Sequence, residues 1–148
     1  MARPLKLSLT RRYRFSASHR LHNAKFSEAE NQKLYGKCSN PHGHGHNYAL
    51  EVTISGPVDA ATGMIANLGD LDPFVHREVL EAFDYKYLNE DVPELRGVVP
   101  TTEMLTREIC RRLAAFPSAR IERVRVEETS KNSFEISQEE PHDGDGMA

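Results

Sequence analysis

Two long stretches of alternating apolar and polar residues constrain the fold of this chain more than any other feature. In residues 5–19, apolar side chains and one histidine hold the odd positions, and Arg11 is the one charged residue among them. The alternation returns in residues 44–55 and ends at Gly56 and Pro57. A period of two residues is typical of a strand with one buried face. The sequence therefore predicts two long, half-buried strands.

Two helices are expected in the second half of the chain. Asp72 and Pro73 are typical of a helix N-cap and of a first helical position, and the apolar residues after them recur at helical spacing. A second helix is expected with Thr101 or Thr102 as its N-cap, because a threonine hydroxyl accepts from the free amides of a first turn. By contrast, residues 20–43 follow no period, and we expect a long loop there.

Two shorter strands, expected at residues 121–128 and 133–137, complete the predicted fold class. The order of elements predicts one α+β domain, with a four-stranded antiparallel sheet and two helices on one of its faces. We expect this single domain to span residues 1–137. The acidic, glycine-containing segment 138–148 is expected to be a disordered tail.

Composition and charge exclude several classes of function. The formal net charge of −3 at pH 7 argues against general binding of nucleic acids. No apolar run approaches the roughly 20 residues of a membrane-spanning helix, and no secretory signal precedes the first predicted strand. We therefore expect a cytoplasmic protein that binds neither nucleic acid nor membrane. Cys38 and Cys110 are expected to be free thiols, the second of them in a helix core.

Three histidines share the buried faces of the two long predicted strands. His44 and His46 lie two residues apart, so their side chains point the same way, and His19 is in phase with the apolar row of the first strand. If the two strands pair, the three imidazoles converge at one end of the sheet. Catalytic zinc usually has three protein ligands and one open position. We predict such a site here, in preference to three buried histidines satisfied by hydrogen bonds.

The segment GKCSNPHGHGHNY, residues 36–48, places a thiol and a further histidine beside these predicted ligands. Spacing alone also allows His42 to be a ligand, but we prefer the histidine pair that runs into the strand. Cys38 follows Lys37, a cation expected to favour the reactive thiolate. The alternative for Cys38 is an incidental loop cysteine.

Glu128 is an acidic residue on a predicted buried row. It continues the alternation of Val124 and Val126, whereas Glu127 continues the row that faces solvent. Because burial of an unpaired carboxylate is costly, Glu128 is expected to have a partner. The alternative is that the strand ends before this residue.

Five motifs together resemble the 6-pyruvoyltetrahydropterin synthase family. They are FSASHRLH at 15–22, GKCSNPHGHGHNY at 36–48, TGMIANLGDL at 62–71, PTTE at 100–103 and VEET at 126–129. The resemblance implies the tunnelling fold (T-fold), whose subunits assemble into a barrel, here as a homohexamer made of two trimers. It also implies conversion of 7,8-dihydroneopterin triphosphate to 6-pyruvoyltetrahydropterin, with elimination of triphosphate.

The resemblance also implies roles for individual residues. The implied roles are Zn²⁺ ligand for His19, His44 and His46, general base for Cys38, and pterin contact for Glu128, Thr101, Thr102 and Glu103. A carboxylate suits the pterin because the ring N–H and amino group form a paired donor edge that it accepts in bidentate fashion. Local arginines and lysines are expected to receive the triphosphate.

One departure from the family pattern concerns proton transfer. The family typically has an Asp-His pair in a loop resembling LDHxxLN, whereas this chain has Asp84 followed by Tyr85. A tyrosine, with an ordinary pKa of about 10, is a poor proton acceptor at neutral pH. We therefore hypothesise that His42 acts in catalysis together with Asp84, in place of the missing histidine.

Three alternative functions remain open at this point. One is the related 6-carboxytetrahydropterin synthase of queuosine biosynthesis, which uses the same substrate and zinc but cleaves more of the side chain. A second is a pterin-binding homologue that no longer catalyses, as the change to Tyr85 allows. A third is a structural zinc protein in which Cys38 coordinates the metal.

Overall fold

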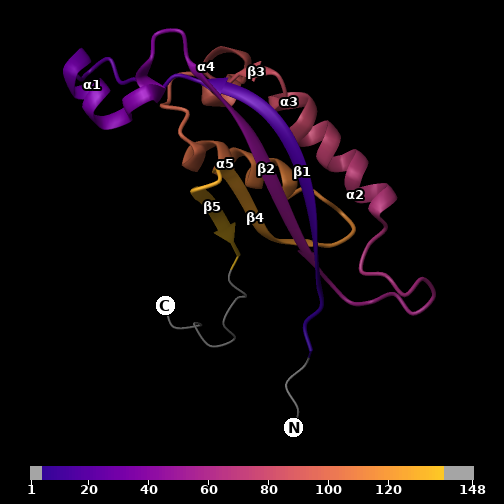
Figure 1. The fold of residues 1–148 in the computed structure, drawn as a ribbon. Coiled ribbons are helices and arrows are strands. Elements are labelled where there is room, and N and C mark those ends of the chain that lie inside the picture. The colour runs from indigo at the N-terminus through magenta and orange to yellow at the C-terminus, as the bar shows by residue number, and fades with distance from the viewer. Residues whose placement is uncertain (1–4, 139–148) are drawn as a thin grey trace, which may run out of the picture.

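The computed structural model describes residues 5–138, which fold into one sheet with helices packed against it (Figure 1). The predicted tail, residues 138–148, lies outside this range except for its first residue. In the range that is described, no helix is long and apolar enough to cross a membrane.

Five strands form a single mixed sheet in the order β3-β1-β2-β4-β5. The strands are β1 (Ser8–His19), β2 (His44–Ser55), β3 (Lys86–Tyr87), β4 (Arg120–Thr129) and β5 (Asn132–Ser137). The four longer strands pair antiparallel, as predicted. The prediction of a purely antiparallel, four-stranded sheet is wrong, because β3 pairs in parallel with β1 at Ala17 and Ser18. A strand of two residues is too short to leave a period in the sequence.

The helices lie between the strands in sequence; most of them pack against one face of the sheet, whereas the first projects beyond the ends of β1 and β2 (Figure 1). They are α1 (Glu28–Tyr35), α2 (Leu68–Val75), α3 (Glu81–Phe83), α4 (Leu88–Asp91) and α5 (Thr102–Leu113). A π-helical turn at His76–Leu80 joins α2 to α3. Short 3₁₀ turns occur at Gly36–Ser39 and Pro93–Leu95.

The start of α2 differs from the prediction. Asn67 is the N-cap, because its side chain accepts from an amide of the first turn at 2.8 Å. Asp72, the predicted cap, instead accepts hydrogen bonds from Arg11 and Tyr13 at 2.9 and 2.7 Å. Pro73 therefore lies inside the helix and not at its first position. For α5 the prediction of a threonine cap is confirmed, since Thr101 accepts from a first-turn amide at 3.3 Å.

Helix α1 occupies part of the segment that was expected to be a loop. Ser27 caps it by accepting from the Glu30 amide at 3.1 Å. Its buried residue is Asn31, whose side-chain amide donates to three backbone carbonyls and accepts from the Asn23 amide at 2.8 Å. Because α1 is held by hydrogen bonds and not by an apolar stripe, it has no hydrophobic period from which it could be predicted.

The core lies between the sheet and the helices. In the sheet it consists of the alternating rows predicted from the sequence, namely Phe15, Ala17, Tyr48, Leu50, Val52, Ile54, Val124 and Val126. Strands β1 and β2 pair along their whole length, which places His19 opposite His44 and Ala17 opposite His46. The histidines therefore lie at one end of the apolar core.

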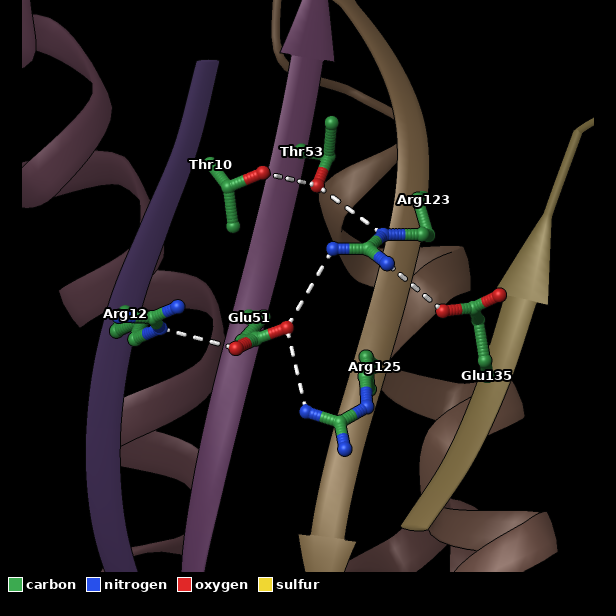
Figure 2. A network of polar contacts seen from close by, with 7 residues as sticks. All are labelled: Thr10, Arg12, Glu51, Thr53, Arg123, Arg125 and Glu135. Atoms are coloured by element: carbon green, nitrogen blue, oxygen red, sulfur yellow. Dashed lines mark hydrogen bonds and ion pairs between the residues drawn. The ribbon is translucent and has the colours of Figure 1, made fainter. Parts of the chain in front are cut away.

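The other face of the sheet carries a network of charged side chains (Figure 2). Glu51 lies at its centre, 2.9 Å from Arg12 and 3.4 Å from both Arg123 and Arg125. The hydrogen bond from Arg12, together with the charge of Arg125, holds the pKa of Glu51 below its ordinary value. Ion pairs thus link three neighbouring strands on the face that has no helices.

Candidate metal centre and active site

Three imidazole rings lie together at the end of β1 and β2. The ring centroids of His44 and His46 are 4.7 Å apart, and those of His19 and His46 are 5.1 Å apart. His19 is fully buried, and the His46 side chain is 10% exposed. The convergence expected from strand parity is therefore present in the fold, and the assignment of these residues as metal ligands stays a prediction.

Backbone contacts determine which nitrogen of His19 is available to a ligand. Its Nδ1 lies 3.0 Å from the carbonyl oxygen of Pro100. Because a carbonyl only accepts, Nδ1 carries the proton and Nε2 carries a lone pair. The Nε2 atoms of His19 and His46 are buried, and neither has a hydrogen-bond partner in residues 5–138. Two buried nitrogens without partners, one of them oriented by a backbone carbonyl, fit a bound metal ion.

The electrostatic surroundings of His19 and His46 favour the neutral form of both imidazoles, which can bind a metal. Burial lowers the pKa of His19, and the neighbouring His46 lowers it further. Burial also lowers the pKa of His46, although the Glu128 carboxylate acts in the opposite direction. Both rings are thus kept neutral, and neutral imidazole is the form that binds a metal.

Cys38 lies beside the same nitrogens. One ligand atom each from His19, Cys38 and His46 forms a group in which all atoms are within 4.8 Å of one another. The 3₁₀ turn that carries Cys38 is tied to the end of β1, because the Leu21 amide donates to the Cys38 carbonyl at 2.6 Å. His44 is not part of this group, although its ring contacts that of His46. In the structure the predicted base, Cys38, therefore belongs to one compact group with the predicted ligands His19 and His46, and the predicted ligand His44 lies outside that group.

The ionisation of Cys38 differs from the expectation. Lys37 was expected to favour the thiolate, but Lys37 is exposed. Burial of the thiol raises the pKa of Cys38, and the Glu128 carboxylate raises it further. A thiolate at this position consequently needs a further positive charge nearby, and a bound metal ion is the kind of group that provides one.

Glu128 faces the imidazoles from β4. Its Oε1 lies 3.2 Å from His46 Nε2 and 3.8 Å from His19 Nε2, and neither contact has the geometry of a hydrogen bond. Its other oxygen accepts from the Asn132 side chain at 2.9 Å. The side chain is 12% exposed. The hydrogen-bond partner of this carboxylate is therefore Asn132, and its other oxygen lies close to the two histidines without bonding to them.

Two buried hydroxyl groups form no hydrogen bond of good geometry within the described part of the chain, although Thr102 lies close enough to Tyr48 to act on its pKa. They belong to Tyr48, which is 1% exposed, and to Thr102, which is 2% exposed. The Tyr48 ring stacks on Phe15 and lies 5.6 Å from the His46 ring. The sequence analysis did not select Tyr48, although it follows His46 in the same buried row. In the PTTE motif, Thr102 is thus buried, whereas Glu103 is exposed.

The structure does not bring the other predicted catalytic residues to this cluster. His42 is exposed in the loop before β2 and is absent from the metal-capable group. Asp84 accepts from the Ser16 amide at 2.8 Å, and the Tyr85 amide donates to the Ser16 carbonyl at 2.6 Å. Tyr85 has a φ of 59° and is 87% exposed. Asp84 and Tyr85 therefore attach the segment before the edge strand β3 to Ser16 of β1.

Comparison with known proteins gives a consistent result. Residues 8–139 match the family model described as 6-pyruvoyl tetrahydropterin synthase. The chain is 46% identical to 6-pyruvoyl tetrahydrobiopterin synthase of Poecilia reticulata over 125 residues, which cover 84% of this chain and 85% of the relative. It is 44% identical to the Homo sapiens protein of the same name over 131 residues, covering 88% and 90%.

A solved structure of Caenorhabditis elegans 6-pyruvoyl tetrahydropterin synthase has the same fold. The TM-score is 0.84 at 36% sequence identity, and the match covers 94% of this chain and 100% of that one. Together, the family model, the two relatives and this structure show that the chain belongs to the 6-pyruvoyl tetrahydropterin synthase family.

Proposed function

We propose that this protein converts 7,8-dihydroneopterin triphosphate to 6-pyruvoyltetrahydropterin with elimination of triphosphate. Family membership and the names of its relatives support this reaction. The structural observation that carries the proposal is the group formed by His19, Cys38 and His46, in which a thiol lies within 4.8 Å of two imidazole nitrogens that have no other partner among the described residues.

We infer that His19, His44 and His46 bind Zn²⁺. The neutral rings and the proximity of the three imidazoles support this ligand set, and three nitrogen ligands leave an open position for a substrate oxygen. Bound zinc would supply the positive charge that stabilises negative charge developing on the substrate.

In the proposed reaction Cys38 is the general base. Its sulfur takes a proton from a carbon of the substrate side chain, and the C–O bond to the triphosphate breaks, with the electron pair leaving on the triphosphate oxygen. Glu128 accepts hydrogen bonds from the ring N–H and amino group of the pterin. The buried hydroxyls of Tyr48 and Thr102 are free to bond to the same ligand, and their lack of partners within residues 5–138 supports this role.

Thr101 and Glu103 are proposed to act at the margin of the pterin site. Thr101 supports the site as the cap of α5, and the exposed carboxylate of Glu103 is available to an incoming ligand. Asp84 is proposed to be a positioning residue: it accepts a hydrogen bond from the Ser16 amide and so holds β1, the strand that carries His19, in place. The proposal for His42 rests on the sequence alone.

We also propose that the protein is cytoplasmic and assembles as a homohexamer of two trimers, as the resemblance to the family implies. Light scattering of the purified protein should then give a mass of about 100 kDa, six times that of the 16.7-kDa chain. A mass of one chain at micromolar concentration would contradict this assembly.

The reaction is tested by incubating zinc-loaded protein with 7,8-dihydroneopterin triphosphate and identifying the products by mass. We expect 6-pyruvoyltetrahydropterin and inorganic triphosphate. Release of acetaldehyde would instead identify the 6-carboxytetrahydropterin synthase reaction. Tight binding of pterin without release of triphosphate would identify a homologue that no longer catalyses.

A further inference from the structure

One short segment, residues 84–89, covers the outer edge of β1 over the last residues of that strand. The amide and the carbonyl of Ser16 both bond to this segment, and two residues later Ser18 pairs with Tyr87 of β3. In an extended chain the backbone groups of every second residue face the same edge. Arg20 is therefore the next residue whose amide and carbonyl need partners at this edge.

The side chain of Asn89 supplies both of these partners. Its Oδ1 accepts from the Arg20 amide and its Nδ2 donates to the Arg20 carbonyl, both at 2.8 Å. A carboxamide carries a donor and an acceptor in one plane, as a peptide group does, so this side chain takes the place of a neighbouring strand. Asn89 belongs to α4 and directly follows Leu88, which is fully buried. The backbone of Arg20 is thus clamped to an anchored helix.

The turn that carries Cys38, Gly36–Ser39, is attached to the clamped part of the chain. The Leu21 amide donates to the Cys38 carbonyl at 2.6 Å, and the Arg20 Nε donates to the Ser39 carbonyl at 3.3 Å. None of the four residues of the turn is buried, so apolar packing contributes little to its placement. The position of the Cys38 thiol therefore depends on where Arg20 and Leu21 are held.

We propose that Asn89 is a positioning residue for Cys38, which sets the place of the thiol by clamping Arg20; this inference rests on the proposed function. The His19 ring has an anchor of its own, the Pro100 carbonyl at 3.0 Å. Loss of the clamp therefore displaces the proposed base more than the imidazoles. A general base works only within hydrogen-bonding reach of the proton that it takes, and a displacement of about 1 Å costs up to about a hundredfold in rate.

Hydrogen exchange of the Leu21 amide tests the clamp without reference to the reaction. The acceptor of this amide is the Cys38 carbonyl and not Asn89, so faster exchange reports that the turn has separated from the end of β1. In zinc-loaded Asn89→Ala, NMR should show exchange at Leu21 that is at least about tenfold faster than in the wild type.

Asn67→Ala is the matched control for this measurement. It also removes an asparagine side chain that accepts a hydrogen bond at 2.8 Å, as the N-cap of α2, and it should also destabilise the fold. Exchange at Leu21 should nevertheless be unchanged in this variant, because α2 makes no part of the clamp. A thermal melt of both variants checks that they are folded. If Asn89→Ala does not fold, Asn89→Asp, which keeps the acceptor for the Arg20 amide and loses the donor, takes its place in the comparison.

Steady-state kinetics show whether the clamp acts through the thiol. In Asn89→Ala, kcat should fall by about tenfold or more, while KM and the zinc content change little, and Asn89→Asp should recover part of the rate. Asn67→Ala should keep kcat. In a Cys38→Ala background, replacement of Asn89 should cause no further loss, because the base that it positions is absent.

The outcomes distinguish failure of the clamp from failure of the proposed reaction. The proposal is overturned if Leu21 exchanges equally fast in Asn89→Ala and Asn67→Ala, or if kcat is unchanged although exchange is faster. An equal loss of rate from Asn89→Ala with and without Cys38 also overturns it. If exchange at Leu21 is faster in Asn89→Ala alone and the wild type shows no turnover, the placement of the turn by Asn89 is supported and the proposed reaction fails.

Discussion

His19 donates its Nδ1 proton to the carbonyl oxygen of Pro100 across 3.0 Å, so the ring that ends β1 is oriented by the residue that precedes the cap of α5. This hydrogen bond connects two motifs that lie 81 residues apart in the sequence. With the proton on Nδ1, the Nε2 atom of His19 has a free lone pair, and the same hydrogen bond orients that atom toward the other two histidines. The start of α5 therefore contributes to the geometry of the proposed metal site.

Replacement of Thr101 by alanine should affect both stability and metal binding. Loss of the cap is expected to lower the free energy of unfolding by about 1 kcal/mol. Zinc affinity should fall as well, because the Pro100 carbonyl that orients His19 lies next to the frayed turn. Urea denaturation and competition with a chelator measure the two effects, and Thr101→Ser should preserve both. Unchanged zinc affinity in a destabilised Thr101→Ala would contradict the link.

Replacement of Cys38 by alanine distinguishes a base from a metal ligand. As the proposed base, Cys38 should be dispensable for zinc binding, whereas turnover should fall by about a hundredfold or more. Zinc content and activity are measured on the same sample, with Cys110→Ala as the control expected to keep both. Loss of zinc together with unfolding in a thermal melt would instead indicate a structural zinc site that includes Cys38.

Replacement of Tyr48 by phenylalanine should separate stability from binding. The buried Tyr48 hydroxyl forms no hydrogen bond of good geometry within residues 5–138 and has only the nearby Thr102 side chain beside it, so its removal should change the free energy of unfolding of the ligand-free protein by no more than about 1 kcal/mol. Affinity for dihydroneopterin should fall if the hydroxyl bonds to the pterin. Tyr13→Phe is a useful comparison, since that hydroxyl donates to Asp72 at 2.7 Å and its loss should destabilise the fold. A Tyr48→Phe variant with unchanged affinity would remove Tyr48 from the site.

The charge network on the helix-free face predicts a pH dependence of stability. The folded pKa of Glu51 lies below its ordinary value of 4.5, so its contribution is present above that value and is lost as the pH falls through the folded pKa. Glu51→Gln should therefore lower the free energy of unfolding by about 1 kcal/mol at neutral pH, with a difference that shrinks in acid. Denaturation at several pH values checks this. A difference that stays constant with pH would rule out ionisation of Glu51 as its source.

Replacement of His42 by asparagine tests the remaining catalytic hypothesis. If His42 takes the place of the family histidine, kcat should fall by tenfold or more while KM for the substrate changes little. Asparagine keeps a similar size and polarity at this exposed position. Steady-state kinetics decide the question, and full turnover would exclude His42 from catalysis.

Parity along the strands predicted which side chains of the candidate site lie together, whereas their roles stay predictions. The period of two residues placed His19, His44 and His46 on one face, and the observed register puts the first two directly opposite each other. The same alternation predicted that the Glu128 side chain points to the buried face, and its Oε1 lies 3.2 Å from His46 Nε2. These predictions succeed because each side chain is fixed by a regular backbone.

Other features depend on contacts that leave no apolar period in the sequence. Helix α1 is held by Asn31, β3 has two residues, and Asp72 bonds to β1 instead of capping a helix. The pKa of Cys38 likewise depends on burial and on Glu128, and not on the adjacent Lys37 in the sequence. Contacts between distant segments determine β3, Asp72 and Cys38, whereas α1 depends on local polar contacts of Asn31.

The way in which α1 is attached has a consequence for ligand access. Glu28 and Asn31 of this helix line an open cavity of about 740 Å³ that also reaches His44, and the helix is fastened by polar contacts of one amide side chain. Detaching it exposes little apolar surface to water, so the free energy of this local opening is much smaller than that of unfolding the core. A local opening of α1 would therefore widen this cavity at little cost, while the sheet and its histidines stay in place.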